Sequence, residues 1–300
     1  MNFLKILAAV TTSALLATTA CADEARDLME QVDDNSRMTS ESAFIKMQLS
    51  TCKFSVADGK IRCTEKPRIK VLETAQMNTG PDKKDSKSIA IVLEPAAERG
   101  IGMLSYIYDD SDKDNETWLY LSALGKVKRM ASGNSNDEDT ESTSLFGSEI
   151  TTEDRETGKL DDYTYSILQK GDYQGRPVAI VQQVPIPKRA AVSDYAKTIS
   201  WIDTERLITL KAQMYDKNDK AVKRMQVSQV EEINGVWMAR SLTVMNLVTN
   251  RLTNMSMDAI SFDVAIDEIE PLGCKRRAGR QHGTQRRQRD VLARPVIRFF

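Results

Sequence analysis

Apolar and polar residues alternate along most of this chain, so that every second residue is apolar over short runs. A period of two is typical of β-strands that bury one face and expose the other. Such runs follow one another from residue 44 onward and predict a protein made mainly of strands. The predicted strands cover residues 44–56, 60–74, 87–93, 102–108, 117–121, 126–131, 163–169, 177–184, 198–203, 206–215, 220–229, 235–247 and 250–262.

Short turn signals join several of these strands. Asp58-Gly59, residues 217–219 and Asn234-Gly235 are typical of tight hairpins, which connect antiparallel neighbours. The alternation of strand and helix that marks a parallel α/β protein is missing. A meander of roughly eleven long strands cannot stay flat, because strand twist curls it. We therefore predict a mainly β fold: a curled antiparallel meander that forms an open half-barrel with covering helices.

Two segments have a helical pattern instead. Residues 23–38 place apolar residues on one face and acidic residues around them, as in an amphipathic helix. A shorter helical piece is expected over residues 145–156. Both are available to cover the opening of the half-barrel. Residues 132–144 contain no apolar side chain, and we interpret them as a solvated surface loop, with a loop that gates access to the opening as the alternative.

The first 22 residues have the pattern of a secretory signal peptide. Lys5 precedes an apolar stretch at residues 6–16, and small residues follow up to Ala22. Cleavage after Ala22 is expected to leave an exported, periplasmic protein in which residues 23–271 form one domain. Lipid attachment at Cys21 is the alternative, and it is disfavoured because Thr18 stands where an apolar residue is expected. No other run reaches the length of a membrane-spanning helix.

Charge divides the chain into an acidic body and a basic end. Lys5 and nine residues of 272–300 account for ten of the 42 basic residues, so 32 basic residues in the body face 42 acidic ones. An acidic body is a poor binder of nucleic acid. The segment 272–300 lacks any strand or helix period. Three explanations compete: a disordered basic arm, an end that binds anionic lipid, and a reading-frame change in the gene. The abrupt break in composition favours the reading-frame change.

Two of the four cysteines, Cys52 and Cys63, flank the predicted hairpin around Asp58-Gly59. If that turn closes the pair, the two thiols lie near each other across antiparallel strands. An oxidising compartment would then join them in a disulfide. Two reduced cysteines are the alternative. A metal site is disfavoured, because two cysteines without a nearby histidine cannot complete a tetrahedral set of ligands.

The residues required by most enzymes are missing. The single histidine, His282, lies in the basic end, so the body has no imidazole for a catalytic triad, general base or zinc site. The acidic run at residues 109–116 resembles the start of a calcium loop, but glycine and the final glutamate are not where such a loop needs them. We predict no catalytic residue, no metal and no cofactor. Carboxylate-only catalysis is the chemistry least restricted by these absences.

Aromatic residues and methionine provide the positive evidence. Thirteen methionines are spread mainly among the strands, and methionine forms an adaptable apolar wall. Large rings lie in or beside the strands as well. A filled barrel core explains any single one of these residues, whereas the set favours a lined cavity. The residues predicted to line it are Trp118, Tyr120, Leu121, Phe146, Tyr195 and Trp201.

Residues 118–129 read Trp-Leu-Tyr-Leu-Ser-Ala-Leu-Gly-Lys-Val-Lys-Arg. This segment resembles the Trp-Leu-Tyr-Leu-Pro-x-Leu-Gly-Lys-Val-x-Arg signature of outer-membrane lipoprotein-sorting proteins in the LolA-like superfamily, with Ser122 in place of proline. Further matches follow in the expected order over roughly residues 40–270. They are Phe146-Gly147-Ser148, Tyr195-x-Lys197, Trp201-Ile202-Asp203 and Tyr215-Asp216.

The resemblance implies a periplasmic carrier without catalysis. Such a protein would hold the acyl chains of a lipid or lipoprotein in its cavity and pass them to a membrane partner. By resemblance, that partner is an inner-membrane transporter of the RND or MMPL type. One alternative is an envelope-stress sensor that binds a signalling protein, although sensors of this architecture carry a second domain. A lipid hydrolase that uses carboxylates is the other.

One measurement tests both the predicted cleavage and the predicted reading-frame change. We expect the intact mass of the native protein to match a chain that begins at Asp23 and whose residues after 271 differ from the printed sequence. A mass that includes the printed residues 272–300 would exclude the reading-frame change. A mass increased by acyl groups at Cys21 would replace cleavage after Ala22 with lipid anchoring.

Overall fold

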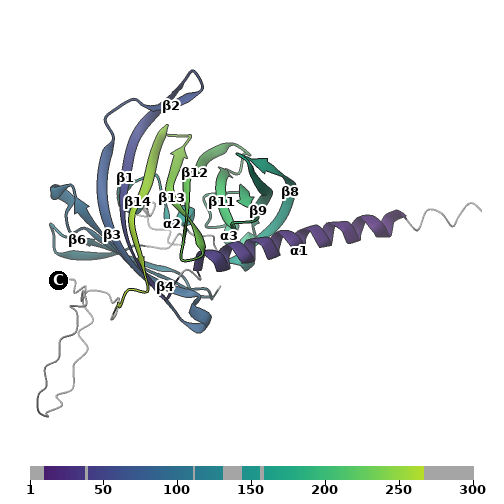
Figure 1. Cartoon of the computed structure of the whole chain (residues 1–300), viewed down its shortest axis with the longest axis horizontal. Helices are drawn as coiled ribbons and strands as arrows, with labels where there is room; N and C mark the ends of the chain where they lie inside the picture. The colour runs from purple at the N-terminus through teal and green to yellow at the C-terminus, as the bar shows by residue number, and fades with distance from the viewer. Residues whose placement is uncertain (1–9, 38–39, 111, 131–143, 156–158, 267–300) are drawn as a thin grey trace, which may run out of the picture.

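In the computed structural model of the chain, the described residues are 10–37, 40–110, 112–130, 144–155 and 159–266. They contain fourteen strands in one antiparallel, strongly curved sheet (Figure 1). The strands of the N-terminal half are β1 (Ser42–Ala57), β2 (Lys60–Cys63), β3 (Arg68–Thr79), β4 (Asp85–Glu94), β5 (Gly102–Ile107), β6 (Glu116–Leu121) and β7 (Lys126–Met130). The strands of the C-terminal half are β8 (Tyr163–Tyr173), β9 (Arg176–Pro185), β10 (Lys197–Asp203), β11 (Ile208–Tyr215), β12 (Ala221–Ile233), β13 (Val236–Asn246) and β14 (Arg251–Phe262).

The sheet consists of two meanders that meet at β1. One runs from β3 to β7 and the other from β8 to β14, and β1 pairs with β3 on one side and with β14 on the other. Strands β7 and β8 are the two ends of the hydrogen-bonded order among the described residues, so the sheet curls without closing. The prediction of an open, curled antiparallel meander is therefore confirmed.

The predicted strands agree with the observed ones except at one place. The run at residues 60–74 is divided into β2 and β3, because Pro67 cannot donate a ladder hydrogen bond and the chain turns around it. The predicted turns hold as well. Asp58 and Gly59 have φ of 52° and 71°, and Asn234 and Gly235 have 53° and 82°, which are the left-handed values of hairpin turns.

Alternation along the strands gives the sheet two different faces. The concave face carries the main core, where Leu49, Leu72, Val92 and Val244 are each at most 1% exposed. Their neighbours in sequence point to the convex face and are mostly half-buried or exposed. Because the sheet stays open, this apolar concave face must be covered by other parts of the chain.

Helix α1 (Val10–Arg37) covers the concave face at the C-terminal meander. Ala25, Met29 and Val32 pack there against a cluster that includes Val181 and Ile202. The helix is longer than residues 23–38: it begins at Val10, and its N-terminal end extends away from the sheet (Figure 1). Residues 1–9 of the predicted signal peptide lie outside the described residues, as do the loop residues 132–143 and the basic end at 272–300. No described helix combines the length and apolarity needed to cross a membrane.

A second cover is formed by residues 144–155, which we call the covering segment. It contains the 3-10 turn η3 (Leu145–Gly147) and the short helix α2 (Thr152–Arg155), where the sequence predicted one helical piece. Leu145, Phe146 and Ile150 are buried in the main core beneath the N-terminal meander and β13–β14. Phe146 adopts a left-handed φ of 51°, which turns the segment back into the sheet.

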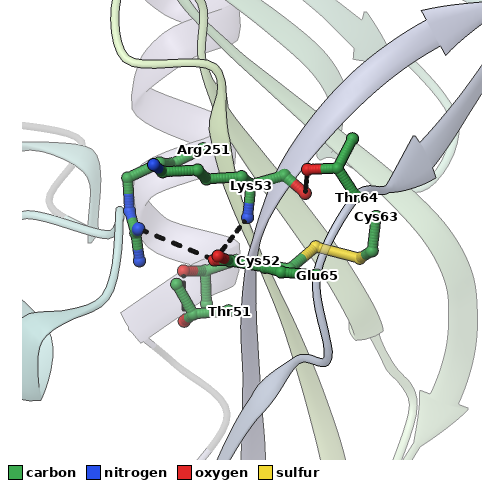
Figure 2. Close-up of a disulfide and its surroundings, with 8 residues drawn as sticks. Thr51, Cys52, Lys53, Cys63, Thr64, Glu65 and Arg251 are labelled. Atoms are coloured by element: carbon green, nitrogen blue, oxygen red, sulfur yellow. Dashed lines mark hydrogen bonds and ion pairs between the residues drawn. A yellow bond between two sulfur atoms is a disulfide. The ribbon is translucent and has the colours of Figure 1, made fainter.

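The disulfide predicted between Cys52 and Cys63 is present, with the two Cα atoms 5.8 Å apart (Figure 2). It joins β1 to the end of β2. Close by, the Thr64 amide and hydroxyl donate to the Lys53 carbonyl at 2.9 and 3.3 Å, and the Lys53 amide donates to a Glu65 carboxylate oxygen at 3.1 Å. The hairpin base is thus fixed by a covalent bond and by hydrogen bonds.

Removal of this disulfide should weaken folding measurably. A crosslink between residues 11 positions apart lowers the entropy of the unfolded chain, and we expect Cys52→Ala/Cys63→Ala to lose about 2 to 3 kcal/mol of unfolding free energy. Urea denaturation monitored by circular dichroism measures this loss. Reduction of the native protein should shift the midpoint similarly, while reductant should leave the double variant unchanged. An unaltered midpoint in both experiments would contradict the stabilising role.

Candidate functional site

A cavity of about 600 Å³ lies on the concave side of the sheet, between helix α1 and the covering segment. Its volume is within the range of small-molecule sites in proteins. Residues of both meanders line it, so the curvature of the whole sheet shapes the cavity. Its methionines are Met29, Met47, Met103, Met214, Met225, Met238, Met255 and Met257.

The wall of the cavity is mixed in chemistry. Apolar side chains such as Ile45, Leu242 and Val244 accompany the methionines. Polar side chains line other parts, and many of them come from β3, β4 and β5. The polar members on these strands are Thr74, Gln76, Asn78, Ser86, Ser88 and Ser105. A molecule with an apolar chain and a polar end matches such a wall better than a wholly apolar one does.

Asp154 is the centre of a buried polar network at this cavity. Its side chain is 0% exposed and accepts hydrogen bonds from the Lys223 ammonium at 2.7 Å and from the Tyr195 hydroxyl at 2.7 Å. The Thr151 amide and hydroxyl donate to it at 2.8 and 2.9 Å. Burial, together with the adjacent Asp154, raises the pKa of the Tyr195 phenol, which therefore stays a neutral donor. The network attaches α2 to β12 and to the start of β10.

Three further hydrogen bonds attach the other end of the covering segment. Glu149 accepts a hydrogen bond from the Arg251 guanidinium at 2.8 Å, and its amide donates to the Thr253 hydroxyl at 2.9 Å. The Lys70 ammonium donates to the Phe146 carbonyl at 2.7 Å. The covering segment is thus held by polar contacts at its margins and by apolar packing beneath.

Glu153 connects the same segment to the chain before β10. It accepts hydrogen bonds from the Arg189 guanidinium at 3.0 Å, the Ser193 hydroxyl at 2.5 Å and the Asp194 amide at 3.1 Å. Arg189 follows Pro187 in the short helix α3 (Pro187–Ala190). The carboxylates at this side of the cavity are therefore occupied by protein donors.

Of the six residues predicted to line a cavity, Tyr195 does so. Phe146 is close by but belongs to the packed core under the covering segment, where it is 8% exposed. Leu121 points to the same face of β6 as Leu119, which packs against the main core. Leu121 nevertheless lies outside the cavity wall. The remaining three residues lie on the other face of the sheet.

Trp118 and Tyr120 are on the convex face, because Leu119 between them points to the concave core. The Trp118 ring meets Tyr106 edge-on with centroids 5.1 Å apart. Tyr120 stands opposite Gly102, where an added Cβ would lie 3.9 Å from the tyrosine Cβ. The sequence prediction that these two rings face the cavity is corrected by this register.

Trp201 is also on the convex face, since Ser200 next to it lines the cavity. The Lys211 ammonium lies 3.9 Å above the Trp201 ring, and Tyr173 packs at 6.5 Å between centroids. Burial lowers the pKa of Lys211. Trp201 therefore stabilises the outer surface of the sheet through a cation–π contact.

The Trp201-Ile202-Asp203 motif has a structural explanation. Ile202 is fully buried against α1, and Asp203 is fully buried beside Arg176 at 2.8 Å. Asp203 also accepts the backbone amides of Glu205 and Arg206, both at 3.0 Å, which fixes the turn into β11. Although burial opposes ionisation, these hydrogen bonds from Arg176 and the turn lower the pKa of Asp203.

The predicted site missed Trp237, which lines the cavity and carries the Arg206 guanidinium 4.0 Å from its ring. It also missed most of the methionine wall. These residues are among the strand aromatics and methionines of the sequence. Alternation alone, however, could not show which face of each strand points into the cavity. Among the described residues, no group of three or more potential ligands could hold a metal ion.

Comparisons with known proteins agree with this architecture. A family model described as that of an uncharacterized protein matches residues 84–269, more than half of the chain. No curated protein matches the sequence. A DUF1329 family protein from Desulfovibrio piger is similar in structure, with a TM-score of 0.70 and 23% identity over 82% of this chain and 95% of that one.

Two further solved structures have the same fold. An outer membrane lipoprotein-sorting protein domain from Vibrio parahaemolyticus gives a TM-score of 0.68 at 20% identity, over 82% of this chain and 95% of that one. A LolA superfamily protein from Nitrosomonas europaea gives 0.55 at 14% identity, over 79% and 93%. At these identities the likeness establishes the fold.

The network around Asp154 predicts an unequal response to two lysine substitutions. We expect Lys223→Met to lose roughly 3 to 5 kcal/mol of unfolding free energy, because it leaves a buried carboxylate without its cation. Lys197→Met is the matched control: its partner Asp219 is 73% exposed, and the loss should be below about 1 kcal/mol. Urea denaturation compares them. Equal losses would show that the buried pair has no special role in attaching the covering segment.

Proposed function

Because this chain belongs to the family whose model matches residues 84–269 and has the fold of the LolA superfamily, we propose that it is a periplasmic carrier of lipid or lipoprotein acyl chains. The observation that carries this proposal is the cavity of about 600 Å³ on the concave face. It is bordered by two separate covers and stays partly open, because the sheet does not close. The acyl chain would occupy the space between the sheet, α1 and the covering segment.

The methionine wall supports an acyl ligand. Methionine has three rotatable bonds and a polarisable sulfur, so its side chain adapts to chains of different shape. Burial of each methylene contributes about 0.8 kcal/mol, and ten sequestered carbons would give roughly 8 kcal/mol before ordering costs. The polar side chains of β3 to β5 would then remain for the polar end of the ligand.

The covering segment provides a route for entry and transfer. Its polar contacts at Asp154, Glu149 and Phe146 would have to open as it moves, and the buried Asp154–Lys223 pair would be the costliest of them. Leu145 and Ile150 beneath the segment contact the cavity. An acyl chain could take over the apolar contacts of these side chains as the segment moves outward. The same exchange in reverse would release the chain to a membrane partner, for which an RND or MMPL-type transporter is our proposal.

Transport without catalysis is part of the proposal. Glu153 and Asp154 are carboxylates at the cavity, and each accepts hydrogen bonds from several protein donors. A general base or nucleophile needs a free oxygen directed at its substrate. These carboxylates instead attach the covering segment, which suits a protein that binds and releases its ligand unchanged.

Native mass spectrometry of protein taken from the periplasm tests the proposal directly. We expect a bound species that dissociates on organic extraction and that lipid analysis identifies as acyl-containing. Purified protein should also bind a fluorescent fatty acid such as dansyl-undecanoic acid. Protein that carries no lipid and binds no acyl probe would overturn the carrier function, and turnover of a lipid would replace it with hydrolysis.

A substitution that fills the cavity should weaken binding of this probe. Ser88 lines the cavity on β4, and Ser88→Phe would occupy space needed by at least two methylenes, which predicts a roughly tenfold or greater loss of affinity. Ile89→Phe is the matched control, because the next residue on β4 points to the convex face. Fluorescence titration of both variants measures the difference. Equal affinities would place the acyl chain outside this cavity.

A further inference from the structure

The end of the β1–β2 hairpin projects beyond the sheet. The pairing of β1 with β14 ends at Lys53 and its pairing with β3 ends at Thr51, whereas β2 continues with β1 from Phe54 to Ala57. Residues 54–63, which we call the tip hairpin, therefore rise above the neighbouring strands (Figure 1). This segment takes no part in the cavity wall.

The tip hairpin has two chemically different faces. Val56 lies directly opposite Ile61, and alternation places both on the side of Phe54. Val56 is 64% exposed and Ile61 is 44% exposed, so a cross-strand apolar pair points into solvent. The opposite face carries Lys60 and Arg62, both exposed. A two-stranded ribbon with one apolar and one cationic face is amphipathic.

Positive charge is concentrated around this ribbon. The residues from 53 to 68 include five cations and two carboxylates, Asp58 and Glu65. Glu65 is engaged at the hairpin base, where it accepts the Lys53 amide and lies 3.9 Å from Arg251 (Figure 2). The five cations are Lys53, Lys60, Arg62, Lys66 and Arg68, and all are exposed or half-buried. The rest of the body is acidic, so the tip hairpin differs from it in sign.

The ribbon is braced at its base. The Cys52–Cys63 disulfide crosses it, and the Phe54 amide donates to the Asn250 carbonyl at 2.8 Å. Phe54 itself is 8% exposed. An exposed pair of apolar residues at the end of a fixed ribbon keeps its orientation, so it can meet a surface without rearrangement.

From this geometry we propose that the tip hairpin docks the protein on an anionic lipid bilayer. The ribbon enters with its turn first, so that Val56 and Ile61 on one face reach the headgroup region while Lys60 and Arg62 on the other face contact lipid phosphates. Long cationic side chains can keep their charge at the interface while the neighbouring apolar groups are buried. The docking is independent of the cavity, so it holds whether or not the cavity carries an acyl chain.

The charge pattern favours a bilayer over a protein partner. Anionic lipid attracts cations near its surface without requiring a matched partner for each. Two aliphatic residues form a small apolar area, with no aromatic residue exposed at the tip, whereas protein interfaces depend on aromatic anchors. The disulfide holds the tip hairpin in one conformation, so docking does not have to order a flexible loop.

Co-sedimentation with vesicles tests this proposal on the full-length mature protein. We expect binding to vesicles of phosphatidylglycerol and phosphatidylethanolamine, little binding to phosphatidylcholine, and weakening by salt. Val56→Ser/Ile61→Ser should lower partitioning about tenfold or more. Lys60→Gln/Arg62→Gln should lower it roughly thirtyfold at low salt, since each cation near the surface strengthens binding about fivefold.

Matched variants elsewhere control for loss of charge and apolar area. Leu124→Ser/Val127→Ser removes two residues of similar exposure, 63% and 42%, one from the turn between β6 and β7 and one from the start of β7. Lys217→Gln/Lys220→Gln removes two exposed cations before β12. Both should partition as the wild type does. Circular dichroism and acyl-probe affinity should be unchanged in all four variants, which separates docking from the carrier function.

Two outcomes would overturn the proposal. Absence of binding to anionic vesicles would leave a protein as the partner of the tip hairpin. Equal weakening by the tip and control variants would mean that membrane attraction is spread over the whole surface. If the acyl probe fails to bind while the tip variants still lose vesicle binding, the carrier function fails and the docking surface stands.

Discussion

The structure depends on one constraint: a curled sheet with an apolar concave face that never closes on itself. A closed barrel would satisfy that face with its own opposite wall. Here the described strands end at β7 and β8, so α1 and the covering segment bury the face instead. The cavity is the space these two covers leave between them. Architecture and candidate function thus have the same origin.

Much of the fold could be predicted from the sequence because the signals were local. A period of two and Asp58-Gly59 or Asn234-Gly235 turns depend on neighbouring residues alone, and they gave strands and hairpins in the right order. The covers were recognisable as helical pieces. The face that each strand turns inward is a property of the assembled sheet, and for that reason Trp118 and Trp201 were expected in the cavity but lie on the convex side.

The segments that carry the resemblance have mainly structural roles in this chain. Trp118 packs on Tyr106, Phe146 fills the core under the covering segment, and Asp203 holds Arg176 and the turn into β11. Residues of this kind maintain a curved sheet and its cover, which several binding functions could share. Apart from Tyr195 and Lys197, the cavity wall is formed mostly by methionines and polar residues outside these segments, so the sequence signature contains little information about the ligand.

The central position of β1 has a consequence for the order in which the molecule can be assembled. Its partner β14 lies some two hundred residues further along the chain, with Lys53 paired to Arg251 and Ala43 to Phe262. Each meander can organise from nearby segments, but they can join only after the final strand has become available. Contacts this distant in sequence slow folding and expose unpaired strand edges in the interim. Until β14 has been made, the edge of β1 that will pair with it stays open to other strands.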